Sequence, residues 1–139
     1  MKEIISAFRN NDIFKDFNNN ELWQLAGEME KEVYVSGEKL FSADEKASNI
    51  YILIDGHFLV HLPDKRAFTL MNPGDIIGTE PFLDKSFYVT TCTCLSKKGV
   101  CGVLTGKTLV NVEKRYASIN SKLIRLKNEF LSKTKYFKR

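Results

Sequence analysis

The residues of this sequence that could do chemistry are few, and the three cysteines come first. Cys92 and Cys94 lie two residues apart, and Cys101 follows seven residues later. In an extended segment Cys92 and Cys94 would project from the same face and could present two thiolates to a soft metal ion, but a fourth ligand has no evident candidate. An odd number of cysteines does not indicate a disulfide framework. We therefore favour an interpretation in which all three are small buried side chains of strands.

The two histidines are the other candidates for metal or haem chemistry. His57 and His61 would share one face of a strand, where they could hold iron or manganese as in cupins, or bind haem. No glutamate lies at matching spacing, so we favour exposed or hydrogen-bonded histidines. The sequence has no Gly-x-Ser-x-Gly elbow, phosphate loop or His-Glu-x-x-His motif, and its carboxylates are scattered. We therefore predict that the chain is not an enzyme.

Length and composition indicate one soluble domain. With 139 residues, of which 43% are hydrophobic, the chain can enclose a core without disulfides or a metal ion. No run approaches the roughly 20 apolar residues of a membrane span, and the N-terminus lacks the apolar region of a secretory signal. These features predict a cytoplasmic protein without a membrane span.

Charge is distributed unevenly along the chain. From Lys97 onward twelve Lys or Arg residues stand against Glu113 and Glu129, so this part carries about +10 and the preceding 96 residues carry about −6. A basic segment can attract nucleic acid or an anionic membrane surface, but a solvated helix face also explains it and is the interpretation we favour. A basic helix without base-reading architecture would give DNA only salt-sensitive, non-specific affinity.

Two short helices are expected in residues 1–30. Residues 3–9 and 21–29 carry apolar side chains at helical spacing, and Asn20 is the expected N-cap of the second helix. Both helices would pack on the following strands through an apolar cluster. That cluster consists of Ile13, Phe14 and Phe17.

Residues 31–106 show the rhythm of short strands separated by turn residues. Gly37 and Gly56 stand where tight turns need a positive φ angle, and Asp55-Gly56 predicts a hairpin between its neighbouring strands. About eight short strands at regular spacing indicate a closed barrel or jelly roll rather than an α/β sheet. The segments that we expect to be extended are 32–35, 39–41, 50–54, 58–62, 67–70, 88–95 and 100–104.

The period of the apolar pattern changes in residues 107–139. Leu109, Val110 and Val112 fit one short helix, and an apolar stripe with spacings of three and four follows. The stripe fits either the seam of a homodimer or amphipathic packing onto the barrel. We favour a homodimer formed through this C-terminal helix. The residues of the stripe are Tyr116, Ile119, Leu123, Leu126, Phe130 and Phe137.

Three short motifs occur in a specific order along the chain. They are Gly37-Glu38 followed by Leu40-Phe41, Tyr51-Ile52-Leu53 leading to Gly56, and Gly74-Asp75 followed by Ile77-Gly78. In this order and spacing, over residues 13–130, the chain resembles the cyclic-nucleotide-binding domain of Crp/Fnr regulators, protein-kinase regulatory subunits and gated channels. The resemblance implies a mainly β fold, a jelly-roll β-barrel with short N-terminal helices and a C-terminal helical tail.

The resemblance also implies a phosphate-binding cassette at residues 78–91, a short helix whose backbone amides face the cyclic phosphate. The family pattern places a Glu directly after the glycine, to hold the ribose hydroxyl, and an Arg about nine residues later, to pair with the phosphate. Here Thr79 occupies the Glu position, with Glu80 one residue later, and Tyr88 stands where the family has Arg. A phenol cannot replace the charge and two-pronged hydrogen bond of a guanidinium. These departures argue against binding of cyclic AMP at the strength usual in the family.

A candidate pocket follows from the position of the cassette. If cyclic AMP or cyclic GMP is the effector, Lys85 would supply a cation and a threonine hydroxyl would help to hold the phosphate. The candidate residues are Gly78, Thr79, Glu80, Phe82, Leu83, Lys85, Tyr88, Thr90 and Thr91.

An apolar or aromatic effector is the alternative for a pocket that has lost its cation. Phe82, Phe87 and Tyr88 would crowd the same site, although we favour the barrel core as the place of these rings. Gly74 and Gly78 bracket a segment where the backbone could approach a ligand closely, and turn geometry alone explains these glycines equally well.

The sequence therefore predicts a sensory or regulatory domain rather than an enzyme. The resemblance implies the effector-binding region of a Crp/Fnr-type transcriptional regulator, or a stand-alone relative, in which residues 116–137 transmit the binding of a small molecule. In those regulators a helix-turn-helix domain follows, so we expect contact with DNA only through a domain that this chain does not contain. The alternative is a degenerate domain that binds no ligand and serves dimerisation or interaction, which the missing Arg and displaced Glu favour.

Overall fold

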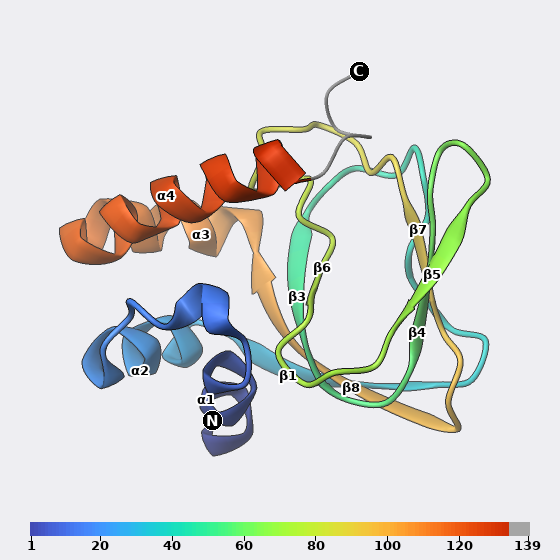
Figure 1. Ribbon diagram of the computed structural model, residues 1–139, viewed down its shortest axis with the longest axis horizontal. Coiled ribbons are helices and arrows are strands. Elements are labelled where there is room, and N and C mark those ends of the chain that lie inside the picture. Colours follow the sequence, from blue (N-terminus) through green and yellow to red (C-terminus); the bar gives the residue numbers. More distant parts are fainter. Residues whose placement is uncertain (134–139) are drawn as a thin grey trace.

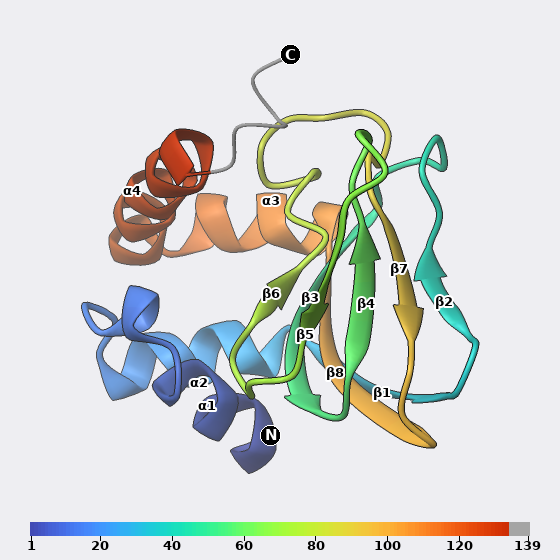
Figure 2. The ribbon, with the colours of Figure 1, turned by 45° about the vertical axis from the view of Figure 1, so that its right-hand side comes forward.

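The computed structural model describes residues 1–133, in which eight strands form two antiparallel sheets (Figure 1, Figure 2). The strands are β1 (Glu30–Val35), β2 (Lys39–Phe41), β3 (Asn49–Asp55), β4 (Phe58–His61), β5 (Ala67–Leu70), β6 (Ile76–Ile77), β7 (Thr91–Cys94) and β8 (Lys98–Thr105). The first sheet has the order β1-β8-β3-β6 and the second has the order β2-β7-β4-β5. The two sheets face each other as a jelly roll, which confirms the predicted fold class.

The helices lie together on one side of the barrel (Figure 1, Figure 2). They are α1 (Lys2–Arg9), the 3-10 helix η1 (Asp12–Phe14), α2 (Asn19–Gly27), α3 (Gly106–Arg115) and α4 (Ala117–Lys133). They cover the outer face of the first sheet, where Ile52 of β3 and Leu104 of β8 join a helical core. Tyr51 and Leu53, which alternate with Ile52 along β3, belong instead to a barrel core between the two sheets.

Strand β8 lies between these two cores. It pairs with β1 on one side and with β3 on the other, both antiparallel. Residues 99–104 are all buried, because one face of the strand lines the barrel and the other faces the helices. This explains why β8 is a continuous apolar run, whereas β7, with the sequence TCTC, alternates between buried and half-buried residues.

Asn18, rather than Asn20, caps helix α2. The Asn18 side chain accepts a hydrogen bond from Glu21 N (2.8 Å), and Glu21 Oε1 accepts one from Asn18 N (2.9 Å). This reciprocal pair is a capping box, and an N-cap of this kind contributes about 1 kcal/mol. Asn20 lies within the first turn of the helix, so the prediction that it is the N-cap is wrong.

Asp55 and Gly56 connect the two sheets and do not form the predicted hairpin. Strand β3 belongs to the first sheet and β4 to the second, so the prediction that these strands pair is wrong. Gly56 has a φ angle of 104°, and a Cβ atom there would lie 2.8 Å from the Cα atom of Gly99. The corner between the sheets therefore requires glycine, as the sequence indicates.

The apolar stripe of the C-terminal segment is divided between a turn and helix α4. Tyr116 lies in the turn after α3, and Ile119, Leu123 and Leu126 are buried in the helical core of the same chain. These three side chains follow the alternative of amphipathic packing within the chain. Phe130 packs half-buried against the same core. Phe137 lies outside the described residues.

Three cations of α4 are paired with carboxylates of the same chain. The pairs are Lys122 with Glu21 of α2, Arg125 with Asp16, and Lys127 with Asp84. They attach α4 to three different segments, so these three cations of the basic tail serve the fold. None of the helices in residues 1–133 has the length and apolar character needed to cross a membrane.

Candidate functional site

Residues 78–91 run from the end of β6 in the first sheet to the start of β7 in the second. The backbone folds into a single turn, in which Leu83 N donates to Thr79 O (3.0 Å) and Lys85 N donates to Glu80 O (2.9 Å). The resemblance implies a short helix here, and a hydrogen-bonded turn takes its place. Asp84 ends the turn with a φ angle of 60°. Strand β7 starts at Thr91 rather than at residue 88, because the three preceding residues belong to this loop.

Glu80 holds the two ends of the loop together. Its side chain is buried, and Oε2 accepts hydrogen bonds from Val89 N (3.0 Å), Thr90 N (3.2 Å) and Thr90 Oγ1 (2.8 Å). Burial raises the pKa of Glu80, although the hydrogen bonds from Thr90 and Val89 oppose that shift. Oε2 would have to give up these bonds to hold a ribose hydroxyl, as the family pattern requires of a Glu.

Tyr88 points into the barrel. Its hydroxyl donates a hydrogen bond to Asn49 O (2.5 Å) and accepts one from Asn49 N (3.0 Å). Its ring lies on the ring of Phe41, with the centroids 3.9 Å apart and an interplanar angle of 13°. Burial raises the pKa of Tyr88, so its phenol stays neutral and supplies no charge for a ligand.

Three rings form an aromatic stack inside the barrel: Phe41, Tyr51 and Tyr88. Phe41 is the middle ring, since its centroid is also 5.8 Å from that of Tyr51. All three side chains are buried in the barrel core. Phe41 and Tyr51 belong to the sequence motifs but not to the predicted pocket residues, and Asn49 belongs to neither. Only the depth of Tyr88 in the barrel reveals their role, and no local signal carries that information.

The loop before β3 closes over the Tyr88 backbone. Asp44 N donates to Tyr88 O (2.8 Å), Tyr88 N donates to Glu45 O (2.9 Å), and Ala47 N donates to Ser86 O (2.9 Å). The main chain of residues 86–88 is therefore fixed by a second loop, as well as by the ring contacts. Movement of Tyr88 out of the barrel would disrupt both loops.

The remaining candidate residues do not converge on one space. Thr91 Oγ1 accepts a hydrogen bond from Ala43 N (2.9 Å), while Lys85 is half-buried and is the one cation among residues 78–91. A Cβ atom at Gly78, which has a φ angle of 71°, would lie 3.0 Å from the Phe41 ring. At Gly78 the positive φ angle and the nearby Phe41 ring favour a structural role of this glycine over close approach of the backbone to a ligand.

The three aromatic residues that are expected to crowd one site are separated. Phe82, together with Leu83, packs in the helical core, whereas Tyr88 lies in the barrel core. Phe87 is 58% exposed. The favoured prediction that these rings lie in the barrel core is therefore confirmed for Tyr88 and wrong for Phe82 and Phe87, and the alternative that the three rings share one site is wrong as well.

The cysteines and histidines follow the structural interpretations. Cys92, Cys94 and Cys101 are buried in the barrel core as free thiols, and burial raises the pKa of Cys92 to about 12. His57 and His61 are exposed. Among the described residues no three His, Cys, Asp or Glu side chains gather in a group that could hold a metal ion.

Comparison with known sequences gives matches to part of the chain. The family model described as "Cyclic nucleotide-binding domain" matches residues 31–116. An uncharacterized NTE family protein of Mycobacterium tuberculosis and one of Mycobacterium bovis are each 36% identical to this chain over 73 residues. That alignment covers 52% of this chain and only 12% of each mycobacterial protein.

Comparison with solved structures gives matches over most of the chain. The N-terminal domain of a transcriptional regulator from Streptomyces coelicolor has a TM-score of 0.77 and 22% identity, covering 92% of this chain and 94% of that domain. The Thermus thermophilus catabolite activator protein has a TM-score of 0.73 and 15% identity, covering 90% of this chain and 60% of that protein. A regulatory subunit of a cAMP-independent protein kinase A from Trypanosoma brucei has a TM-score of 0.77 and 17% identity, covering 97% of this chain and 47% of that subunit.

Proposed function

The chain belongs to the family of cyclic nucleotide-binding domains, and from that membership we propose that it is a non-catalytic regulatory domain whose cassette is closed by its own side chains and does not bind cyclic AMP or cyclic GMP. The observation that carries the proposal is the position of Tyr88. It stands where the family pattern has Arg, and it is both stacked on Phe41 and hydrogen-bonded to Asn49. The ring therefore fills space inside the barrel instead of presenting a cation to a phosphate.

Energetic considerations support a closed cassette. A cyclic phosphate that entered between the loop and the barrel would have to displace a buried ring and leave the backbone groups of Asn49 unpaired. It would also meet Glu80, a carboxylate whose Oε2 already accepts three hydrogen bonds. Lys85 is the one cation in the loop, which leaves little to compensate these costs.

The similar structures are compatible with a role that needs no cyclic nucleotide. The fold occurs in a transcriptional regulator and in the regulatory subunit of a cAMP-independent kinase, so the fold alone does not imply cyclic AMP binding. We place this domain in a regulator, of transcription or of another activity, in which it works through contacts with protein surfaces. Three cysteines that are all unpaired agree with a cytoplasmic location.

A second candidate function is that of a sensor which responds to an effector other than a cyclic nucleotide. It is favoured by the direct contact between the cassette and α4. The ring of Phe82 meets the ring of Phe130 edge-on at 5.9 Å, and Asp84 pairs with Lys127. A change in the loop would reach α4 through these two contacts.

Homodimerisation through the C-terminal helix remains a prediction. Because Leu123 and Leu126 are buried within the chain, a second copy would have to meet the outer face of α4. Ile124 and Val110 are 53% and 48% exposed and line one groove between α3 and α4. These two residues are the ones that a homodimer would cover.

Thermal unfolding with millimolar cyclic AMP or cyclic GMP tests the proposal. A ligand at about 100 times its dissociation constant adds about 2.7 kcal/mol of stability, so binding would raise the midpoint by several degrees. We expect no shift for the natural sequence with either nucleotide. A reproducible shift would show that the cassette opens and would refute the proposal. The variant with Thr79→Glu and Tyr88→Arg restores both family residues, and a shift in that variant alone would assign the loss of binding to these positions.

A further inference from the structure

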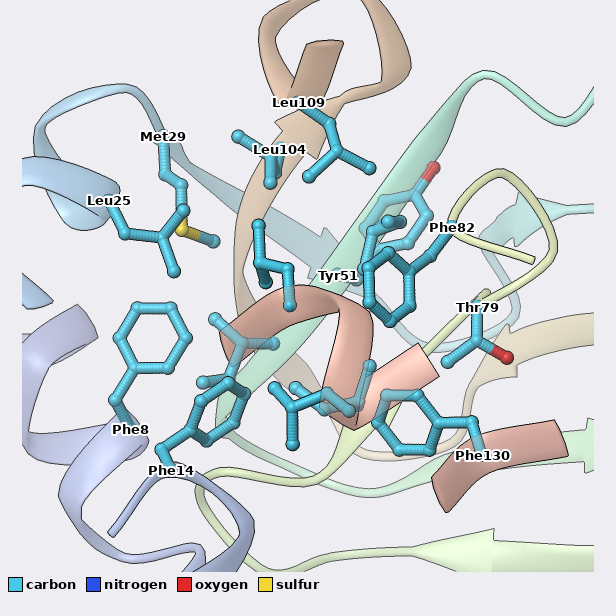
Figure 3. A pocket seen from close by; sticks show the side chains of 15 residues that line it. Phe8, Phe14, Leu25, Met29, Tyr51, Thr79, Phe82, Leu104, Leu109 and Phe130 are labelled. Atoms are coloured by element: carbon cyan, nitrogen blue, oxygen red, sulfur yellow. The ribbon is translucent and has the colours of Figure 1, made fainter. Parts of the chain in front are cut away.

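A cavity of about 50 Å³ lies mainly between the first sheet and the helices, and of its lining residues only Tyr51 belongs to the barrel core. Its walls come from α1, η1, α2, α3, α4, the first sheet and the start of the cassette (Figure 3). The rings of Phe8 and Phe14 form one end, and those of Phe82 and Phe130 form the other. The helical layer therefore leaves a space that its own side chains do not fill.

The walls of this cavity are apolar. Of its 15 lining residues only Tyr51 and Thr79 carry a polar side-chain atom other than sulfur, and both hydroxyls point away from the centre in Figure 3. The Tyr51 hydroxyl donates to Leu40 O (3.2 Å), so it is already engaged on the barrel side. A water molecule in a protein interior needs two to four polar partners, and an apolar cavity without them stays dry. The chemistry of the walls thus favours a non-polar guest over water.

Five lining residues of the cavity are half-exposed: Met29, Ile50 and Ile76, and, beside the start of the cassette, Thr79 and Phe130. Phe8, Leu25 and Leu109 on its wall are buried, whereas Thr79 and Phe130 are half-exposed. Thr79 and Phe130 lie on the same side of the cavity in Figure 3. Entry at this side would leave the outer part of a guest in solvent, which suits a chain better than a compact molecule.

We propose that this cavity binds the terminal alkyl group of a small aliphatic molecule, whose polar head remains in solvent near Thr79 and Phe130. The volume of about 50 Å³ is well below the roughly 150 Å³ of a cavity that accepts benzene, which selects a short length of chain over an aromatic ring. Each methylene that leaves water for such a site strengthens binding about fourfold, until the space is filled. The head group contributes little, because the cavity presents no polar partner to it.

This site lies on the other side of the first sheet from most of the barrel core, although Tyr51 of the aromatic stack lines it. The proposal about cyclic nucleotides concerns the barrel side of the cassette, so either proposal can fail while the other stands. Thr79 belongs to the cassette and also lines the cavity, which places the alkyl site next to the loop.

Titration of the full chain with butanoate, hexanoate, octanoate and octanol tests the proposal, with methyl carbon–proton NMR spectra as the readout. We expect saturable shifts of the Ile52, Leu104 and Leu109 methyl groups, and affinity that rises about fourfold per methylene until the cavity is filled. Octanol and octanoate should bind with similar affinity. The methyl groups of Leu53 and Val60, which belong to the barrel core, should keep their positions. Shifts confined to the barrel core, or no saturable shift at millimolar ligand, would overturn the proposal.

Two substitutions fill the cavity from different walls. Thr79→Phe acts at the half-exposed opening, and Ile50→Phe acts from strand β3. Each should weaken octanoate binding at least tenfold, while Ile124→Phe on the exposed face of α4 should leave it unchanged. Unchanged binding in a folded Thr79→Phe or Ile50→Phe variant would contradict the assigned site. If neither variant folds, the location of the methyl shifts and their dependence on chain length in the natural sequence decide the question.

Discussion

The ring of Tyr88, from the loop between β6 and β7, lies face to face with the ring of Phe41 from β2, and the hydroxyl of Tyr88 is bound to both backbone groups of Asn49. One side chain thereby connects three segments that are distant in sequence. In the family pattern this position carries an Arg that serves a ligand. Here the residue serves the fold.

Removal of the Tyr88 hydroxyl should destabilise the domain without emptying the barrel. Tyr88→Phe keeps the ring on Phe41 but leaves Asn49 N and Asn49 O without their partner, which costs about 1–3 kcal/mol. Urea unfolding at neutral pH measures the loss. Tyr116→Phe, at a half-buried position in the turn before α4, is the matched control and should change the free energy of unfolding by less than about 0.5 kcal/mol. Equal effects of the two substitutions would mean that the bonds to Asn49 contribute nothing.

The buried carboxylate of Glu80 should make stability depend on pH in a defined direction. Burial raises its folded-state pKa above the ordinary value of 4.5, so the folded state binds the proton more tightly than the unfolded state does. The contribution of Glu80 to stability is therefore fully present below about pH 4.5 and is lost as the pH rises through the folded pKa. Glu80→Gln keeps an oxygen that can accept from Val89 and Thr90, and it removes the charge.

The difference in free energy of unfolding between Glu80→Gln and the natural sequence isolates this group from other carboxylates. We expect the difference to shift in favour of the glutamine variant as the pH rises above about 4.5. Guanidinium unfolding at several pH values provides the measurement. A difference that stays constant, or that moves in favour of glutamate as the pH rises, would contradict the assigned direction of the pKa.

The sequence predicts most of the fold because much of its information is local. Alternation and turn residues locate seven of the strands to within two or three residues, and the shift to helical period at Lys107 locates α3 and α4. The prediction of Asn20 as the N-cap of α2 is an error that the sequence itself can correct. The capping-box rule favours Asn18, because Glu21 follows it three residues later.

The errors that remain concern which surfaces meet. The dipeptide Asp55-Gly56 is typical of hairpins, and no local feature reveals that the chain changes sheets there. The spacing of Leu123 and Leu126 fits packing against a partner helix as well as it fits packing against the core of the same chain. Likewise, the sequence favours the barrel core for Phe82, Phe87 and Tyr88 alike, and only the tertiary structure shows that Tyr88 alone enters it. Such features depend on long-range packing, which periodicity does not encode.

The ion pairs of α4 should differ greatly in their contributions to stability. Burial alone would raise the pKa of Glu21, but hydrogen bonds from Lys122 and from the backbone of Asn18 lower it below its ordinary value, so the carboxylate stays ionised. Lys122→Met leaves this buried charge without its cation and should cost about 3 kcal/mol or more. Arg125→Met, which breaks an exposed pair with Asp16, should cost less than about 1 kcal/mol.

Urea unfolding of the two methionine variants gives this comparison, and a third variant separates charge from packing. Combining Lys122→Met with Glu21→Gln removes both charges and should recover most of the lost stability, because the uncompensated carboxylate is gone. If the double variant is as unstable as Lys122→Met alone, the loss comes from the packing of the lysine stem rather than from the charge.

Substitution by Asp should strongly destabilise the domain on one face of α4 and have little effect on the other, which decides between core packing and dimerisation. Leu126 is 5% exposed and lies in the helical core, so Leu126→Asp buries a carboxylate without a partner and should unfold the domain or cost more than about 4 kcal/mol. Ile124 is 53% exposed, and Ile124→Asp should change the free energy of unfolding by less than about 0.5 kcal/mol. Light scattering after size exclusion adds the oligomeric state. If the natural chain is dimeric and the Ile124→Asp variant is folded and monomeric, the outer face of α4 is the dimer contact. If instead a dimeric natural chain gives a folded, monomeric Leu126→Asp variant, the apolar stripe itself forms the dimer contact and its burial within one chain is wrong.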